Sequence, residues 1–250
     1  LCDLADIVHV HALHAARHMI EEWDLAPEKI RIIRHPSYLG AYEDAETTLN
    51  RPLTKTDQRQ FLFFGMMRWS KGVSVMQDAV LRLTRHTTDF HLHIAGKAMP
   101  RQRRRLRHLM EAPNVTPQIG MVSDAELVRL FSEAQVFLAP FDDVFTSGSL
   151  MLAQTFGLPV IGPNRPEMRA FTPKGCHDLL YSDQRPKPIV EMMRRVIAMT
   201  DSELQERREM CLEFSTEISS QNIGRAMTNV LSSLHDSNEI QALTQGNFSE

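Results

Sequence analysis

The sequence predicts an α/β fold in which helices cover both faces of a Rossmann-like parallel sheet. From residue 61 onward, short apolar segments alternate with longer segments whose apolar residues recur every three or four positions. The first pattern is typical of strands buried on both faces, and the second is typical of amphipathic helices. Two of the apolar segments end in loops of small residues, and ligands of parallel sheets bind at such strand ends.

The expected elements follow one another along the whole chain. Before the alternating region, we expect a strand at residues 5–11, a helix at 13–23, a strand at 30–33 and a polar linker at 37–60. Strands are then expected near 61–64, 90–95, 115–119, 135–139, 158–162 and 178–181, with helices near 72–86, 101–111, 124–133, 148–157 and 186–199. A helical segment at 201–234 and a polar, frayed tail at 235–250 complete the chain.

Composition limits the classes of function. The formal net charge is −3, so the overall field gives no case for nucleic-acid binding. Cys2, Cys176 and Cys211 show neither a metal-binding spacing nor a disulfide framework, which suits a reducing compartment. No apolar run approaches the roughly 18 residues of a membrane span. Because the chain begins Leu-Cys-Asp and enters a strand almost at once, we expect it to be a fragment without its upstream part.

The strongest functional signal is the loop at residues 65–72, Gly-Met-Met-Arg-Trp-Ser-Lys-Gly. A strand that ends in a small-residue turn and starts a helix directs free backbone N–H groups and the helix dipole towards one point, where anions bind. Arg68 and Lys71 add two cations beside Gly65, so the expected ligand carries phosphate. The alternative is that both side chains are solvated cations on a loop.

A second loop of the same kind lies at residues 145–149. Thr146, Ser147, Gly148 and Ser149 follow an apolar strand and open a helix. A serine or threonine at a helix start is often only an N-cap. Two such loops on one sheet edge can converge on a single ligand, however, and we therefore interpret this loop as a second phosphate-binding segment.

Weaker candidates lie near these loops and at the other strand ends. They are Gly96, Lys97, Met121, Val122, Asp142, Asp143 and Glu167. The glycine permits close backbone approach, and the lysine after it adds a cation. The backbone of the Met-Val pair is placed to read a nucleobase edge, although helix capping explains that segment equally well. The aspartates are either turn residues or contacts to a sugar hydroxyl or ribose.

Two clusters allow more than one interpretation. Arg101, Arg103, Arg104, Arg105 and Arg107 crowd one predicted helix. A solvated face explains them, and attraction to an anionic membrane surface is the alternative. A histidine cluster at positions 9, 11, 14 and 18 has the spacing of metal ligands on one face, but no carboxylate or cysteine completes the set. We therefore expect no metal site, with a single histidine at position 11 reaching a ligand cleft as the alternative.

Five motifs occur in register along the chain. They are Phe-Phe-Gly-x-x-Arg-x-x-Lys-Gly, Ile-Ala-Gly, Gly-x-Val-Ser-Asp-x-Glu-Leu, Ala-x-Val-Phe-Leu-Ala-Pro and Ala-x-x-x-Gly-x-Pro-Val-Ile. Through them, residues 57–215 resemble the C-terminal donor-binding domain of GT-B glycosyltransferases of the family 4 type. The resemblance implies a remnant of the N-terminal acceptor domain at 1–36, an interdomain linker at 37–60, a nucleotide-sugar-binding domain at 61–215, and a crossing helix with a tail at 216–250.

The resemblance implies transfer of a hexosyl unit from a UDP or GDP type of sugar donor to a hydroxyl acceptor, either a glycan or a lipid-linked molecule. In that family the reaction needs no metal or other cofactor, is mostly retaining and serves polysaccharide biosynthesis. We expect a cytoplasmic enzyme, with peripheral contact to the inner face of the membrane as an option. The family's diphosphate-binding roles carry over to Arg68 and Lys71, and to the segment from Thr146 to Ser149.

One departure from the family pattern matters. The family has two glutamates eight positions apart, one near the transferred sugar and one on the donor ribose, where this chain has Val144 and Leu152. Asp142, Asp143 or Glu167 are the expected substitutes. The alternatives are a degenerate nucleotide-binding scaffold without turnover, and a nucleotide-sugar epimerase or phosphorylase. No catalytic residue is assigned, because the acceptor-side residues of the family lie mostly in the first domain.

Overall fold

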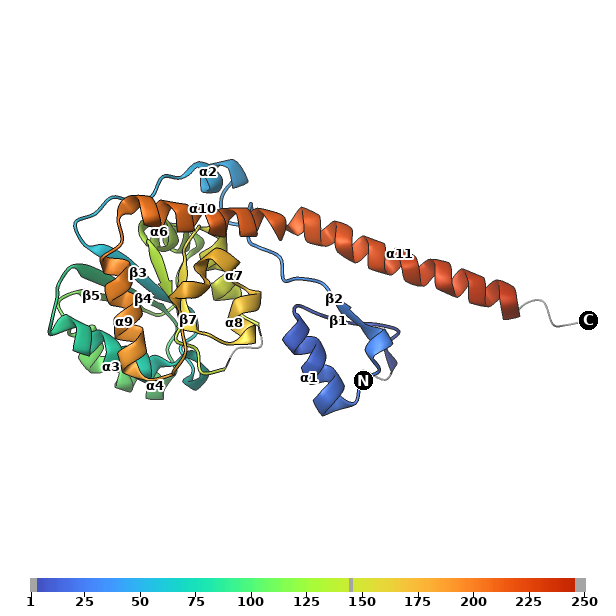
Figure 1. The fold of residues 1–250 in the computed structure, drawn as a ribbon, viewed down its shortest axis with the longest axis horizontal. Coiled ribbons are helices and arrows are strands. Elements are labelled where there is room, and N and C mark those ends of the chain that lie inside the picture. The colour runs from blue at the N-terminus through green and yellow to red at the C-terminus, as the bar shows by residue number, and fades with distance from the viewer. Residues whose placement is uncertain (1–3, 144–145, 246–250) are drawn as a thin grey trace, which may run out of the picture. The chain divides into compact units, whose positions relative to one another are not determined.

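The computed structural model describes residues 4–143 and 146–245 (Figure 1). The chain divides into two compact units, one formed by Leu1–Pro36 with Glu217–Glu250 and the other by Ser37–Thr216. Parallel strand pairing is present in each unit. Every residue that the sequence singles out for phosphate, nucleotide or sugar binding belongs to the larger unit.

A six-stranded parallel sheet forms the centre of the larger unit, which confirms the predicted fold class. The strands are β3 (Arg59–Phe64), β4 (Phe90–Gly96), β5 (Val115–Ile119), β6 (Val136–Leu138), β7 (Val160–Pro163) and β8 (Leu180–Tyr181). Their order across the sheet is β5-β4-β3-β6-β7-β8. The chain therefore starts in the middle, builds one edge through β4 and β5, and returns to build the other edge from β6 outward. This reversal makes β3 and β6 neighbours at a topological switch point.

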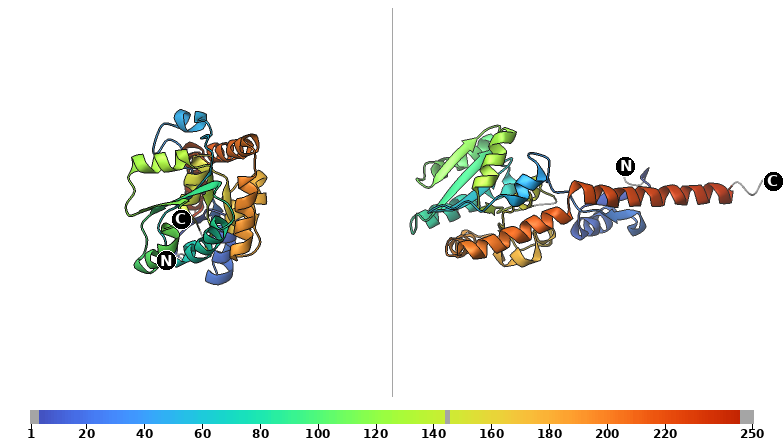
Figure 2. Two further views of the ribbon diagram at one scale, coloured as in Figure 1. Left: turned by 90° about the vertical axis from the view of Figure 1, so that its left-hand side faces the viewer. Right: turned by 90° about the horizontal axis from the view of Figure 1, so that it is seen from above.

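Helices cover both faces of this sheet. They are α3 (Val73–Thr84), α4 (Pro100–Arg105), α5 (Arg107–Met110), α6 (Asp124–Glu133), α7 (Gly148–Thr155), α8 (Pro166–Ala170), α9 (Pro186–Ile197) and α10 (Asp201–Glu217). α3 and α9 pack against each other on one face, and α6 lies on the other (Figure 2). Right-handed crossovers require this arrangement, because the connection through α6 crosses the sheet in the direction opposite to the connection through α3. The helix predicted at 101–111 is split at Leu106 into α4 and α5.

The core of the larger unit follows the predicted periodicity. Phe61, Leu62 and Phe63 in the central strand are all buried, as expected for a strand that helices cover on both sides. The apolar residues of α3 that recur every three or four positions are all buried, namely Val73, Met76, Ala79, Val80 and Leu83. Burial of this stripe fixes the direction of α3, and with it the loop that precedes the helix.

The segment 37–60, for which the sequence predicts a linker, clusters with the larger unit and contains a helix, α2 (Ala45–Asn50). The carboxylate of Asp44 caps this helix by accepting a hydrogen bond of 2.8 Å from the backbone N–H of Thr47. Further along, the Thr54 hydroxyl donates to the Ser132 carbonyl at 3.0 Å. Polar groups attach this segment, so it carries no hydrophobic period that would reveal its structure.

The smaller unit contains a strand–helix–strand motif. β1 (Val8–Val10) pairs in parallel with β2 (Ile30–Ile32), and α1 (Leu13–Trp23) connects them, close to the predicted elements. Ala15 and Ala16 of α1 are buried in a small cluster with Val10. Trp23 at the end of α1 and Ile32 of β2 remain exposed. This unit therefore has a thin core that leaves large apolar side chains at its surface.

The C-terminal helix is longer than the sequence predicts. α11 (Ser220–Gln245) continues through the region for which a frayed tail is expected, and residues 246–250 lie outside the described residues. Between Gly224 and Gly246 the sequence has no further glycine and no proline to end a helix, which is the physical reason for the extension. Among the described helices, none combines the length and the apolar character that a membrane crossing requires.

Candidate functional site

The loops after β3 and β4 meet at the carboxyl edge of the sheet, and Gly96 permits this contact. Gly96 has a φ of +122°, and a Cβ atom built on it would lie 2.2 Å from the carbonyl oxygen of Gly65. Gly65 has a φ of +126°, and its own Cβ would be 3.8 Å from the Ser149 side chain at the start of α7. Backbone therefore approaches backbone here, which only glycine allows.

The loop after β3 also lies directly on the loop after β6. A Cβ atom on Gly72, which has a φ of +63°, would be 1.6 Å from the carbonyl oxygen of Pro140. The carbonyl of Ser70 accepts hydrogen bonds from the backbone N–H groups of Asp142 at 2.9 Å and Asp143 at 3.4 Å. Backbone hydrogen bonds at the switch point of the sheet thus join the loop after β3 to the loop after β6.

A chain of side chains connects the two loops. The Lys71 ammonium donates to the Ser147 hydroxyl at 3.1 Å, and the hydroxyls of Ser147 and Ser149 lie 3.0 Å apart. The same ammonium sits 3.6 Å from the centroid of the Phe141 ring. The structure therefore brings together Lys71, Ser147 and Ser149 from segments about 76 residues apart in sequence.

Burial makes Lys71 an unusual cation. Burial, and to a smaller extent the positive charge of Arg68, together lower the pKa of the ammonium to about 8. Among the described residues, no carboxylate forms an ion pair with Lys71. Arg68 itself is exposed. A bound anion would supply the negative charge that this half-buried ammonium lacks.

The start of α7 has no side-chain cap from Ser147. Ser147 occupies the N-cap position, but its side chain makes no cap hydrogen bond to the helix. Its hydroxyl is instead engaged with Lys71 and Ser149. The simple N-cap explanation of Ser147 is therefore wrong, and the first N–H groups of α7 have no side-chain cap. Thr146 is exposed beside them, and Gly148 begins the helix.

Tyr38 is a residue of this region that sequence analysis did not identify. A Cβ atom on Gly148 would lie 2.9 Å from the Tyr38 hydroxyl, so the phenol reaches the first residue of α7. The backbone N–H of Tyr38 donates to the Thr155 hydroxyl at 3.0 Å, which attaches it to the same helix. Tyr38 lies in the polar segment without periodicity, where no sequence signal separates it from its neighbours.

Asp142 acts mainly as a structural brace. Its carboxylate accepts a hydrogen bond of 3.1 Å from the Gln184 side-chain amide, which also donates to the Pro140 carbonyl at 2.7 Å. The guanidinium of Arg165 donates to the backbone carbonyl of Asp142. Asp143, in contrast, has an exposed side chain. Of the two aspartates, Asp143 is the one whose side chain is open to a sugar or ribose contact.

The remaining candidates follow other strands of the sheet, and no hydrogen bond among the described residues joins them to Lys71, Ser147 or Ser149. Lys97 is exposed directly after β4, and Glu167 is half-buried as the second residue of α8. Met121 is 86% exposed, and Val122 is half-buried after β5. The next residues, Ser123 and Glu126, form a reciprocal capping box at the start of α6. Helix capping therefore accounts for Ser123 and Glu126 at the end of that loop, and the nucleobase role of the Met-Val pair stays a prediction.

Neither family glutamate has an acidic counterpart in the described site. Leu152, which occurs where the second family glutamate is expected, is only 6% exposed and packs in the core from within α7. Val144, at the other position, lies outside the described residues. In the described part of the chain, no three His, Cys, Asp or Glu side chains are grouped so that they could hold a metal ion. Within the smaller unit, His11 Nδ1 lies 3.0 Å from the Ile33 carbonyl.

Comparisons with solved structures agree with the observed architecture. Sucrose-phosphate synthase from Thermosynechococcus elongatus superimposes with a TM-score of 0.75 and 18% identity, over 93% of this chain and 59% of that protein. HepE from Anabaena, solved in complex with UDP and glucose, gives a TM-score of 0.74 and 12% identity, over 92% of this chain and 64% of HepE. WaaG, a glycosyltransferase involved in lipopolysaccharide biosynthesis, gives a TM-score of 0.62 and 17% identity, over 86% of this chain and 61% of WaaG.

These likenesses show the fold, a Rossmann-like domain of the GT-B type, and the chain spans 59–64% of the length of the three proteins. A search of curated proteins found no match. At the level of sequence, the family model of glycosyl transferases group 1 matches residues 58–199, which is more than half of the 250 residues. That match contains both loops of the Lys71 site, and the chain therefore belongs to the glycosyl transferases of group 1.

Proposed function

We propose that this chain is the donor-binding half of a glycosyltransferase that moves a hexosyl unit from a nucleotide-diphosphate sugar to a hydroxyl acceptor. The observation that carries the proposal is the Lys71–Ser147–Ser149 chain beside the uncapped start of α7. It combines a cation that forms no ion pair among the described residues with a helix start that has no side-chain cap, at the switch point of the sheet. A diphosphate has the charge and the acceptor oxygens to match both.

The same groups would promote the reaction. When the bond between the sugar and the donor breaks, the departing nucleoside diphosphate gains negative charge. A fixed ammonium and an aligned helix start stabilise that charge more in the transition state than in the ground state. Because the Lys71 ammonium is already held by the Ser147 hydroxyl and the Phe141 ring, little rearrangement is needed as the charge develops.

The finer features of the proposal have different degrees of support. HepE, a structural neighbour, has been solved with UDP-glucose, which supports a donor of the UDP type ahead of GDP. Transfer without a metal, a retaining outcome, and a glycan or lipid-linked acceptor in polysaccharide biosynthesis rest on the family resemblance. The proposed cytoplasmic enzyme would contact the inner face of the membrane peripherally, for which the support is the exposed arginines of α4 and α5.

A second candidate is a nucleotide-binding scaffold without turnover. The buried Leu152 at the ribose position of the family favours it, because an apolar side chain there removes the usual carboxylate contact. An epimerase on the same two-domain plan would need no separate acceptor. Conversion of the donor alone into an isomer would identify that activity.

Calorimetric titration of the chain with UDP, GDP, ADP and their hexose conjugates tests the proposal. We expect selective binding of one nucleotide and loss of that binding in a Lys71→Ala variant. Binding together with sugar transfer, once the remaining part of the protein is supplied, separates the transferase from the inactive scaffold. If no nucleotide binds to a chain that is folded by circular dichroism, the donor-site assignment is wrong.

A further inference from the structure

A pocket lies between the loop that carries Lys71 and the start of α4. Its volume is about 440 Å³, within the range of small-ligand sites. The lining residues are Arg68, Trp69, Met99, Arg101, Gln102 and Arg105. Three of the six are arginines and none is acidic. The pocket is therefore of ligand size, and its lining residues carry positive charge with no carboxylate among them.

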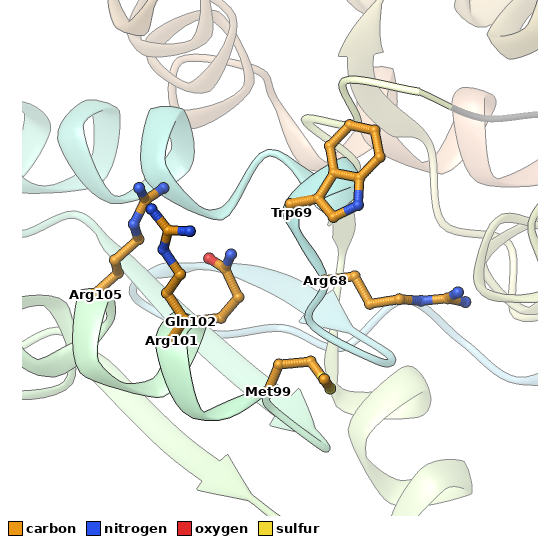
Figure 3. A pocket seen from close by; sticks show the side chains of 6 residues that line it. All are labelled: Arg68, Trp69, Met99, Arg101, Gln102 and Arg105. Carbon is orange, nitrogen blue, oxygen red and sulfur yellow. The ribbon is translucent and has the colours of Figure 1, made fainter.

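The side chains around this pocket suit a ligand that has an anionic group and a larger apolar or sugar moiety. Arg101 and Arg105, one helical turn apart on α4, extend in the same direction, and Trp69 stands across the hollow from them (Figure 3). Arg68 points away from this pair and towards the other side of its loop (Figure 3). Trp69 is 71% exposed, so its ring offers an uncovered apolar wall.

In the described part of the chain, none of the three arginines that line this pocket forms an ion pair. The segment 97–110 has six lysines and arginines and no aspartate or glutamate. Among the described residues, Arg101 and Arg105 form no ion pair, and Arg105 is held in place by a 2.6 Å hydrogen bond to the Ser74 hydroxyl of α3. Two like charges on one face repel each other, and an anion between them would reverse that cost.

We propose that this pocket is a second anion site, which binds the phosphate or pyrophosphate group of a phosphorylated acceptor. Two guanidinium groups supply forked donors for phosphate oxygens, and Trp69 with Met99 offers an apolar surface to the attached sugar or lipid. The anion site itself does not depend on the donor site. Naming its ligand as the acceptor rests on the proposed glycosyl transfer.

The same helix provides a matched control. Arg103 and Arg104 carry the same charge but line a different hollow, of about 420 Å³, together with Arg107. A diffuse attraction to any anionic surface would depend on both pairs equally. A pocket ligand would depend only on Arg101 and Arg105.

The test titrates inorganic pyrophosphate into the chain and into three variants: Lys71→Ala, R101Q/R105Q and R103Q/R104Q. We expect two pyrophosphate sites in the parent chain. R101Q/R105Q should weaken one of them at least tenfold, Lys71→Ala should weaken the other, and R103Q/R104Q should leave both within twofold. Equal losses of pyrophosphate affinity in the two arginine variants would contradict the assignment of an anion site to this pocket. A single pyrophosphate site that only Lys71→Ala affects would contradict it as well. Thermal melts check that each variant is folded.

Two further probes identify the source of the phosphate. Glucose 6-phosphate represents a soluble acceptor, and phosphatidylcholine vesicles carrying a polyprenyl pyrophosphate represent a lipid-linked one. Binding of either that is lost in R101Q/R105Q and kept in R103Q/R104Q supports the acceptor site and names its class. If neither probe binds, the acceptor assignment is wrong. If the chain does not bind UDP but still binds pyrophosphate through Arg101 and Arg105, the donor-site assignment is wrong and the assignment of the anion pocket is supported.

Discussion

Two groups of cations lie at the carboxyl edge of the same sheet, and they differ in their burial and in the contacts that hold them. Lys71 is half-buried, held by Ser147 and Phe141, and has a lowered pKa. Arg101 and Arg105 of α4 are exposed and line a hollow, and Arg105 donates a hydrogen bond to Ser74. The first arrangement suits one charge at one fixed point. The second suits a ligand whose shape varies around its phosphate.

The comparison requires that packing, rather than charge, positions Lys71. Gly72→Ala tests this most severely, because the new Cβ would meet the backbone carbonyl of Pro140 at 1.6 Å. We expect the free energy of unfolding to fall by about 3 kcal/mol or more, since neither backbone can move without separating the loops. Gly120→Ala is the control, because Gly120 has a φ of +151° but open space around it. Equal losses of unfolding free energy in the two variants, measured by denaturant melts, would mean that strain at a positive φ causes the destabilisation and that the contact with Pro140 does not.

The next largest effect should be on the donor. Lys71→Ala is expected to weaken nucleoside-diphosphate binding by about 1–3 kcal/mol, the scale of a lost charge-assisted hydrogen bond. The control is Lys97→Ala, which removes an exposed lysine from the neighbouring strand end. Calorimetric titration with UDP measures both. Similar losses of UDP affinity in the two variants would show that binding depends on the local positive charge alone. The proposed difference between the half-buried Lys71 and an exposed cation would then be wrong.

The pH dependence of binding sharpens the same contrast. Free Lys71 has a pKa of about 8, and a bound diphosphate raises it by supplying negative charge. The complex therefore holds more protons than the free chain above pH 8. UDP affinity should stay level between pH 7 and 8 and then fall by up to about tenfold per pH unit. In Lys71→Arg, whose guanidinium stays charged, the profile should be flat; a parallel fall in that variant would exclude Lys71 as its cause.

The local part of this site was predictable from the sequence, and the long-range part was not. Apolar periodicity predicts α3 and its buried stripe, and the rule for strand ends predicts that the loops of Lys71 and Ser147 share one edge. No local signal indicates that Gln184 braces Asp142, because the two are 42 residues apart and neither belongs to a periodic pattern.

The use of Ser147 shows why a single pattern can mislead. A serine before a helix predicts a cap, and Ser123 does cap α6. Ser147 occupies the same position on α7, yet its hydroxyl faces Lys71, because the β3 loop is packed against it. The choice between the two roles depends on a partner from another strand. Only the assembled sheet supplies that partner.

The smallest expected effect separates those two roles of Ser147. Ser147→Ala removes the acceptor of the Lys71 ammonium, so UDP binding should weaken by about 1 kcal/mol, and the pH at which affinity begins to fall should move below 8. Ser149→Ala, which removes only the next hydroxyl in the chain, should change both quantities less. A cap would behave differently, because its loss lowers thermal stability and leaves the pH profile in place. A lower melting temperature with an unchanged pH profile would return Ser147 to that simpler role, and the fixed position of Lys71 would then rest on burial and Phe141 alone.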